Sequence, residues 1–345
     1  MQTLDTELAW KKYFADVGLR DDVSFEHVRL ASKQLTAHVP VIFDVEHLAK
    51  LLGVSDAYIA SAISASSFHY RTFTIPKRRG GMREISSPRS ALKSVQRWIM
   101  KNILYSVEPH PSAIGFRRQK SILDHACVHN SSIKILKLDI ANFFPSISLS
   151  RVIGVFKGFG YSPGVAFTLA SLCCLDGVLP QGAVTSPALS NLVCRLMDVR
   201  LAALSRKMRL KFSRYADDMA ISGRKLDLSV LPLIEKILRE EGFVLRSDKT
   251  RLYDECSKRV LTGLSAARSG VKLLRSDRRQ LRATFHQIRK FGLLSYVSNH
   301  KVRDPVFLDR LIGRLSFWCF IEPRNEFARE ALQYLMSLKK ELRSG

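Results

Sequence analysis

The chain has 345 residues, which is too long for a single ordinary hydrophobic core. With 46% apolar residues it has enough to fill the cores of two or three subdomains. Its 55 lysine and arginine residues against 31 aspartate and glutamate residues leave a net charge of +24, which favours a polyanionic partner over a solvated basic face. The longest apolar run, residues 165–175, is too short to span a bilayer, and the first residues lack the pattern of an export signal. We therefore expect a cytoplasmic protein, and six cysteines without a C-x-x-C pair indicate a reducing compartment and no zinc site.

Residues 1–66 are predicted to form a helical N-terminal extension. The run VEHLAKLL has Asp44 before it as a capping residue and Gly53 after it, and Ser55 precedes the run DAYIASAIS. The segment LAKLLGVSDAYIASAI also has the apolar spacing and central glycine of a DNA-reading helix-turn-helix. Any pair of short packed helices gives the same pattern, so this second interpretation stays open.

A basic hairpin and a buried strand follow. YRTFTIP, the glycine turn KRRGG and MREISSP, together residues 70–88, predict two strands with positive charge at their tip. After a predicted helix at 91–107, the run KILKLDIANFFPSI indicates a strand that ends on Asp139. Two further helices, at 149–160 and 164–175, lead to VLPQGAVTSPALSNLVCRLMD, a Pro-Gln-Gly loop that opens a long helix.

The stretch RYADDMAISG places Asp217 and Asp218 at the turn of a predicted hairpin, because the apolar runs on either side are too short for helices. A solvated turn would explain two aspartates without any chemistry. Beyond this hairpin the pattern predicts a helix at 228–243, the segment LRSDKTRLY, two strands around RVLTGLS and VKLL, and helices to the end. Basic residues interleave with aromatic ones after residue 276, which suits phosphate contact combined with base stacking.

Asp139 gives the aspartate pair a chemical interpretation. Two Mg²⁺ ions need several oxygen ligands from separate elements, and a tight turn would let Asp217 converge with Asp139. The cations would offset the free-energy cost of crowding carboxylates. Such a site suits in-line phosphoryl transfer, in which one ion activates a hydroxyl group and the other stabilises the leaving pyrophosphate.

Four motifs in order carry a family resemblance. LDIANFF, LPQGAVTSP, YADD and GFVLRSDKT resemble the palm motifs of reverse transcriptases, and residues 70–88 resemble their fingers hairpin, so that the resemblance covers residues 70–275. Within that superfamily the chain is most similar to bacterial retron reverse transcriptases, through the segment SAIGFRRQKSILDHACVH, the short helical N-terminus and the absence of maturase or endonuclease domains. Two retron motifs are altered: Asn-Ala-x-x-His is HACVH here, at His125 to His129, and Val-Thr-Gly is Leu261-Thr262-Gly263.

The resemblance implies an α+β right-hand polymerase, with fingers, a palm built on an antiparallel sheet, a helical thumb and a helical N-terminal extension. The expected divisions are the extension at 1–66, the fingers at 67–132 with part of 158–180, the palm at 133–275 and a basic, RNA-binding thumb at 276–345.

The resemblance also implies roles for individual residues. Asp139, Asp217 and Asp218, with the Ile140 carbonyl, would hold two Mg²⁺ ions, for which Mn²⁺ could substitute. Lys249 would act beside the leaving pyrophosphate as a cation or proton donor. Phe144 would exclude a 2′-hydroxyl from the incoming nucleotide, with Phe143 as the alternative. The remaining expected nucleotide contacts are Arg83 and Lys77 at the triphosphate, Gln181 and Gly182 in the pocket, and Tyr215 under the primer end.

RNA contacts are expected outside the catalytic set. His125 and His129 could bind a metal, but RNA contact or a structural role fits them better, since no third ligand follows. The Thr262-Gly263 pair is either an RNA-binding turn or a plain hairpin turn. The residues expected at the RNA are His129, Thr262, Gly263, Arg278, Arg279 and Arg282.

The implied function is RNA-directed DNA synthesis on a structured non-coding RNA, self-primed from a guanosine 2′-hydroxyl to give a branched RNA–DNA product called msDNA. The implied partners are that RNA, deoxynucleotides, a separate effector protein in anti-phage defence, and a host RNase H, in the bacterial cytoplasm. Alternatives are a group II intron-like or abortive-infection reverse transcriptase, or a non-catalytic RNA-binding scaffold. A maturase would need a longer C-terminal extension, and a diversity-generating enzyme carries Ser-Gln where this chain has Ser186-Pro187.

Overall fold

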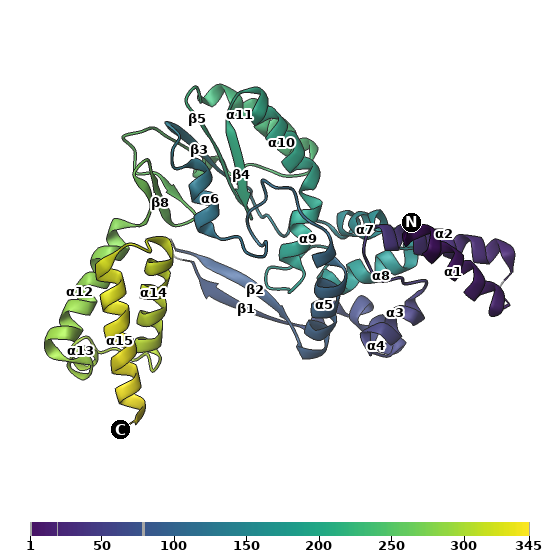
Figure 1. Ribbon diagram of the computed structural model, residues 1–345, viewed down its shortest axis with the longest axis horizontal. Coiled ribbons are helices and arrows are strands. Elements are labelled where there is room, and N and C mark those ends of the chain that lie inside the picture. Colours follow the sequence, from purple (N-terminus) through teal and green to yellow (C-terminus); the bar gives the residue numbers. More distant parts are fainter. Residues whose placement is uncertain (1, 19, 78–79, 345) are drawn as a thin grey trace.

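The computed structural model describes residues 2–18, 20–77 and 80–344. Figure 1 shows the N-terminal helices at one end of the molecule, the C-terminal helices at the other and the largest sheet between them. Within the described residues, no helix combines the length and the apolar character needed to cross a membrane. Antiparallel sheets combined with many helices confirm the predicted α+β class.

The N-terminal helices follow the predicted capping signals. The Asp44 side chain accepts a hydrogen bond from the His47 N–H at 2.7 Å, and Gly53 ends that helix with a left-handed φ of +66°. The Ser55 hydroxyl accepts from the Tyr58 N–H at 3.2 Å. Both short helices pack on α8, which fits the interpretation as a packed pair. The elements are α1 (Gln2–Asp16), α2 (Asp21–Thr36), α3 (Val45–Leu52), α4 (Asp56–Ser64) and α8 (Pro163–Cys173).

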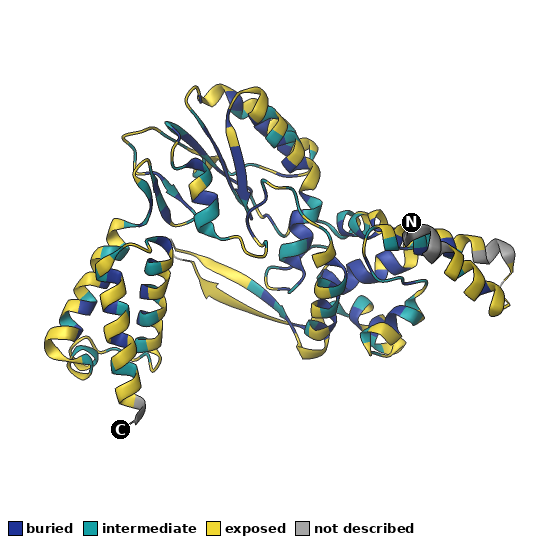
Figure 2. Cartoon of the chain, in the orientation of Figure 1, coloured by how far each residue is buried: buried dark blue, intermediate teal, exposed yellow. Residues whose placement is uncertain are grey.

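A long hairpin of β1 (Tyr70–Pro76) and β2 (Met82–Pro88) confirms the strand prediction. Its distal half is exposed on both strands (Figure 2). Arg78 and Arg79, which the sequence places at the basic tip, lie outside the described residues. The helix after the hairpin, α5 (Ser90–Asn102), ends earlier than predicted, and the 3₁₀ turn Leu104–Ser106 follows it.

The main sheet is fully antiparallel, with strand order β4-β5-β3-β6. Successive side chains of a strand point to opposite faces, so Leu136 and Leu138 join one core with helices α10 and α11, whereas Ile135 joins a second core with helix α6. The elements are β3 (Lys134–Asp139), β4 (Lys211–Tyr215), β5 (Asp218–Gly223), β6 (Arg251–Tyr253), α6 (Ile122–His129), α10 (Arg195–Lys207) and α11 (Leu231–Glu240).

The long helix predicted after the Pro-Gln-Gly loop is wrong in one respect. Cys194, with ψ of 0°, separates α9 (Ser186–Val193) from α10. The predicted long helix is therefore two helices: α9 follows the Pro-Gln-Gly loop, and α10 covers the main sheet. The remaining helix of this region, α7 (Leu149–Gly158), contacts both α8 and α9.

The C-terminal part shares the second core with α6 and one face of the main sheet. The segment RVLTGLS holds two strands and not one, because Thr262 and Gly263, with φ of 45° and 86°, make a two-residue turn between β7 and β8. This is the hairpin turn that the sequence left open. The resulting three-stranded sheet packs against the last helices around the fully buried Trp318. The elements are β7 (Val260–Leu261), β8 (Leu264–Ala267), β9 (Gly270–Leu273), α12 (Arg275–Phe291), α13 (Leu293–Asn299), α14 (Phe307–Ile321) and α15 (Glu326–Ser344).

Candidate active site

Three carboxylates meet at one end of the main sheet. Asp139, the last residue of β3, lies directly opposite Asp218, the first residue of β5, and residues paired in this way point to the same face. Asp217 lies in the turn between β4 and β5, and its backbone carbonyl accepts a hydrogen bond from the Ile140 N–H at 3.1 Å. The register of two neighbouring strands therefore brings together residues that are nearly 80 positions apart in the sequence.

The charges at this end of the sheet are crowded. Burial, and then the neighbouring Asp218 and Asp139 carboxylates, raise the pKa of Asp217 above the ordinary value. Asp139 is only 4% exposed, and its Oδ1 has no hydrogen-bond partner. Two ammonium groups supply countercharge: Lys249 Nζ lies 2.7 Å from Asp139 Oδ2, and Lys137 Nζ lies 3.1 Å from Asp218 Oδ1.

The donor set fits a divalent cation. Carboxylate and carbonyl oxygens are the ligands that Mg²⁺ prefers. On Asp139 a buried carboxylate oxygen has no hydrogen-bond partner and only the Arg246 guanidinium at 4.0 Å, and the pKa of Asp217 is raised. Both observations mark a place where added positive charge would stabilise the protein. Among the described residues no three His, Cys, Asp or Glu side chains already stand at ligand spacing, and lysines supply the countercharge instead.

Aromatic rings gather near the segments that carry Asp139 and Asp217. Phe143 is 5% exposed and belongs to the main core, whereas the partly exposed Phe144 packs at its edge. The ring of Phe116 lies 6.1 Å from Phe144 and 6.3 Å from Tyr215. Sequence reasoning missed Phe116, although it lies inside the segment SAIGFRRQKS that carries the resemblance.

The Pro-Gln-Gly loop is hydrogen-bonded to the β1–β2 hairpin. The Gln181 carbonyl accepts a hydrogen bond from the Ser86 N–H at 2.9 Å. Gly182 has φ of +128°, and a Cβ on it would lie 2.8 Å from the Ser86 carbonyl oxygen. Gly182 therefore makes a close backbone approach to β2, and its contact to a nucleotide stays a prediction. Arg83 and Lys77 lie exposed on the same hairpin, and their contacts to a triphosphate stay predictions.

The structure corrects the role expected for His129. It was expected to contact RNA, but it is fully buried, with Nδ1 2.7 Å from the Ser222 hydroxyl and Nε2 2.8 Å from the Ser213 hydroxyl. His125 Nδ1 lies 2.8 Å from the same Ser213 hydroxyl, and burial lowers the pKa of His125 to about 4. The two histidines fasten α6 to the main sheet, which is the structural role that the sequence left open.

The other expected RNA contacts lie in the C-terminal part. Thr262 and Gly263 form the β7–β8 turn, and Thr262 Oγ1 is buried without a hydrogen-bond partner. Arg279 is exposed on α12, Arg278 is half-buried, and the Arg282 guanidinium lies 5.1 Å from the centre of the Phe327 ring. The RNA-binding roles of these residues stay predictions.

Comparison with known proteins decides the family. The family described as reverse transcriptase (RNA-dependent DNA polymerase) matches residues 75–304. The Retron Ec86 reverse transcriptase of Escherichia coli is 33% identical over 254 residues, which cover 72% of this chain and 79% of that protein. The chain belongs to the retron-type reverse transcriptases.

Further similarities are more partial. The Retron Mx65 reverse transcriptase of Myxococcus xanthus is 35% identical over 277 residues, which cover 71% of this chain and 64% of that protein. A foamy viral protease-reverse transcriptase, solved with double-stranded DNA, aligns with 79% of this chain and 39% of that one at 18% identity and a TM-score of 0.45.

This retron-type reverse transcriptase is an RNA-directed DNA polymerase with a right-hand fold. That the antiparallel main sheet is the palm, the β1–β2 hairpin part of the fingers and helices α12–α15 the thumb stays a prediction. Reverse transcriptase domains generally use divalent metal ions, which agrees with the oxygen donors collected at Asp139, Asp217 and Asp218.

Gly182→Ala is expected to lower the efficiency of nucleotide addition by roughly ten- to a hundredfold, the equivalent of the 1–3 kcal/mol that a strained backbone costs. The new methyl group would collide with Ser86 and displace either Gln181 or the hairpin. Steady-state primer extension measures the change. Gly154→Ala is the control, because a Cβ at Gly154 meets nothing within 4 Å. Equal efficiencies in the two variants would contradict the expected fit.

Proposed function

We propose that this reverse transcriptase copies a cognate structured non-coding RNA into DNA, and that synthesis starts from the 2′-hydroxyl of a guanosine in that RNA to give branched msDNA. The observation that carries the proposal is the 33% identity with the Retron Ec86 reverse transcriptase over most of both chains. The net charge of +24 supports a protein that holds a long polyanion through many phosphate contacts.

Named residues divide the chemistry between them. Asp139, Asp217 and Asp218, with the Ile140 carbonyl, would hold two Mg²⁺ ions, or Mn²⁺ in their place, which activate the attacking hydroxyl and stabilise the leaving pyrophosphate when bound. Lys249, already 2.7 Å from Asp139, would place its ammonium group beside the leaving group and protonate it. The residues proposed to hold the incoming nucleotide are Arg83, Lys77, Gln181 and Gly182, and Tyr215 would pack under the primer end.

Phe144→Ala is expected to raise ribonucleotide incorporation relative to deoxyribonucleotide incorporation by about tenfold or more, because a 2′-hydroxyl would meet empty space in place of a ring. Competition between the two nucleotide types during primer extension measures the ratio. Phe143→Ala is the contrast: that ring is buried in the core, so its loss should lower stability by about 3–5 kcal/mol and leave the ratio unchanged. The opposite pattern would exchange the two assignments.

The proposal includes partners. The thumb, with Arg278, Arg279 and Arg282, and the Thr262-Gly263 turn would hold the cognate RNA, a host RNase H would trim the template, and a separate effector protein would join the enzyme and its product in defence against phage. Rival functions are general primer extension by another type of bacterial reverse transcriptase, and RNA binding without catalysis.

One experiment separates these functions. The protein is purified with its associated nucleic acid and supplied with labelled deoxynucleotides and no added primer, and the product is treated with a 2′–5′ debranching enzyme and sequenced. A labelled DNA that shifts on debranching and maps to one RNA supports the proposal. A linear product made only from an added primer leaves a general reverse transcriptase, and no product under either condition leaves the scaffold.

A further inference from the structure

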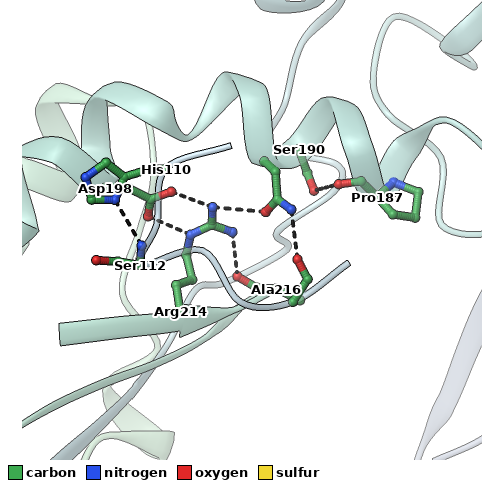
Figure 3. A network of polar contacts seen from close by, with 9 residues as sticks. His110, Ser112, Pro187, Ser190, Asp198, Arg214 and Ala216 are labelled. Atoms are coloured by element: carbon green, nitrogen blue, oxygen red, sulfur yellow. Dashed lines mark hydrogen bonds and ion pairs between the residues drawn. The ribbon is translucent and has the colours of Figure 1, made fainter. Parts of the chain in front are cut away.

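A buried ion pair contacts Ala216, the residue before Asp217 (Figure 3). Arg214 in β4 and Asp198 in α10 are both 0% exposed. The guanidinium donates two parallel hydrogen bonds to the carboxylate, from Nε to Oδ1 at 2.7 Å and from Nη2 to Oδ2 at 2.6 Å. This fork-to-fork geometry fixes the guanidinium in orientation as well as in position.

The same guanidinium holds the turn itself. Its Nη1 donates to the Ala216 carbonyl at 3.2 Å, and its Nη2 also donates to Asn191 Oδ1 at 3.1 Å. Ala216 has φ of 57°, a left-handed conformation that residues with a Cβ adopt at a cost in free energy. The residue that Arg214 binds is therefore the strained one, and Asp217 follows it immediately.

Residues 112–115 pack against the same turn. Arg214 donates its backbone N–H to the Ser112 carbonyl at 2.8 Å, and its own carbonyl accepts from the Ile114 N–H at 2.8 Å. A Cβ on Gly115 would lie 2.6 Å from the Ala216 nitrogen, so this position admits only glycine without a shift. Asn191 links the two sides, because its Nδ2 donates to the Gly115 carbonyl at 2.8 Å.

We propose that Arg214 is a positioning residue, which with Asp198 and Asn191 holds Ala216 in its left-handed conformation and thereby sets the Asp217 and Asp218 carboxylates against Asp139. The inference rests on the proposed catalytic role of those carboxylates. A buried ion pair is a weak device for stability, since apolar residues of similar volume often serve as well. Its bonds to the strained residue of the turn give it a geometric task that apolar residues could not perform.

Arg214→Lys tests the proposal while keeping the buried charge. A lysine ammonium group lacks the planar fork and cannot make the bonds to Asp198, Asn191 and Ala216 together. With a supplied primer annealed to a template, kcat per folded molecule should fall by about ten- to a hundredfold, the scale expected when reacting groups move by roughly 1 Å. KM for the nucleotide should change by less than about threefold, because the nucleotide contacts lie on other elements.

Arg200→Lys is the matched control. Arg200 lies on the same helix as Asp198 but pairs with Glu240 and Glu241, and not with any residue of the turn, so kcat should be unchanged. Direct titration with Mn²⁺, followed by electron paramagnetic resonance, gives a readout that needs no turnover. Arg214→Lys should weaken Mn²⁺ binding, and Arg200→Lys should not.

A rescue variant separates positioning from folding. Glycine adopts positive φ without a steric penalty, so adding Ala216→Gly to Arg214→Lys should recover part of the lost kcat, by about fivefold or more. If the loss in Arg214→Lys only follows its folded fraction, and glycine recovers nothing, Arg214 is a packing residue and the proposal is overturned. Because the assay uses an ordinary primer, it does not depend on branched priming. Wild-type activity in Asp217→Asn would instead remove the catalytic assignment itself.

Discussion

Asp217→Asn is expected to lower DNA synthesis by at least about a thousandfold, because the amide removes a ligand charge worth several kcal/mol in the transition state. Shape and volume hardly change, so RNA affinity should stay near that of the wild type. Primer extension with purified protein measures the activity, and filter binding measures the RNA affinity. Asp227→Asn is the control, because Asp227 is an exposed capping residue away from the carboxylate cluster.

Asp217→Asn should lower activity but raise the thermal stability of the protein. The pKa of Asp217 is raised in the folded protein, so folding favours the protonated form: the stabilising contribution is present below the ordinary pKa of aspartate and is lost as the pH rises through the folded value. At neutral pH without divalent metal, the ionised carboxylate therefore destabilises the protein, and Asp217→Asn should melt at a higher temperature. The difference should shrink toward low pH. A melting temperature that falls at neutral pH would show that the crowding of carboxylates has been misjudged.

Features set by neighbours in the sequence were predictable. Asp44 and Ser55 cap helices within three residues of themselves, and the aspartate hairpin needs only two short apolar runs around a turn. The convergence of Asp139 with Asp217 and Asp218 also followed from the sequence, because metal chemistry demands several oxygen donors together. The caps and the hairpin depend on sequence neighbours, whereas the convergence of the three aspartates depends on the number of oxygen ligands that a metal site needs.

Features set by distant partners were not predictable. His129 looked available for RNA, yet its partners Ser213 and Ser222 lie about 90 positions later and no pattern connects them. Arg214 gave no signal for the same reason. Its partners Asn191 and Asp198 lie on α9 and α10, and the packing of α10 on β4 brings them to Arg214. Thr262 and Gly263 were predictable as a turn, but which sheet they belong to depends on the second core, which distant segments build together.

Replacing Arg278, Arg279 and Arg282 together by glutamine should weaken binding to every RNA by roughly fifty- to two-hundredfold at 0.15 M salt. Each lost phosphate contact lowers the slope of log affinity against log salt concentration by about 0.7 to 0.9. Three such contacts, taken from about 1 M salt down to 0.15 M, give this range. RNA binding measured over a series of salt concentrations gives both the affinity and the slope. Glutamine at Lys50, Lys120 and Arg200 is the matched control, because these three already pair with acidic side chains.

The single variants should not behave alike. The Arg282 guanidinium lies over Phe327 and 5.7 Å from the Trp318 ring, so Arg282→Gln should also lower stability, by about 0.5–1 kcal/mol. Arg279 is exposed, and Arg279→Gln should change RNA affinity alone. Phosphate contacts carry no sequence information, so the triple variant should still prefer the cognate RNA over a related retron RNA in competition. If that preference is lost together with affinity, these arginines recognise the shape of the RNA. Electrostatic affinity and selection of the cognate RNA then depend on the same residues.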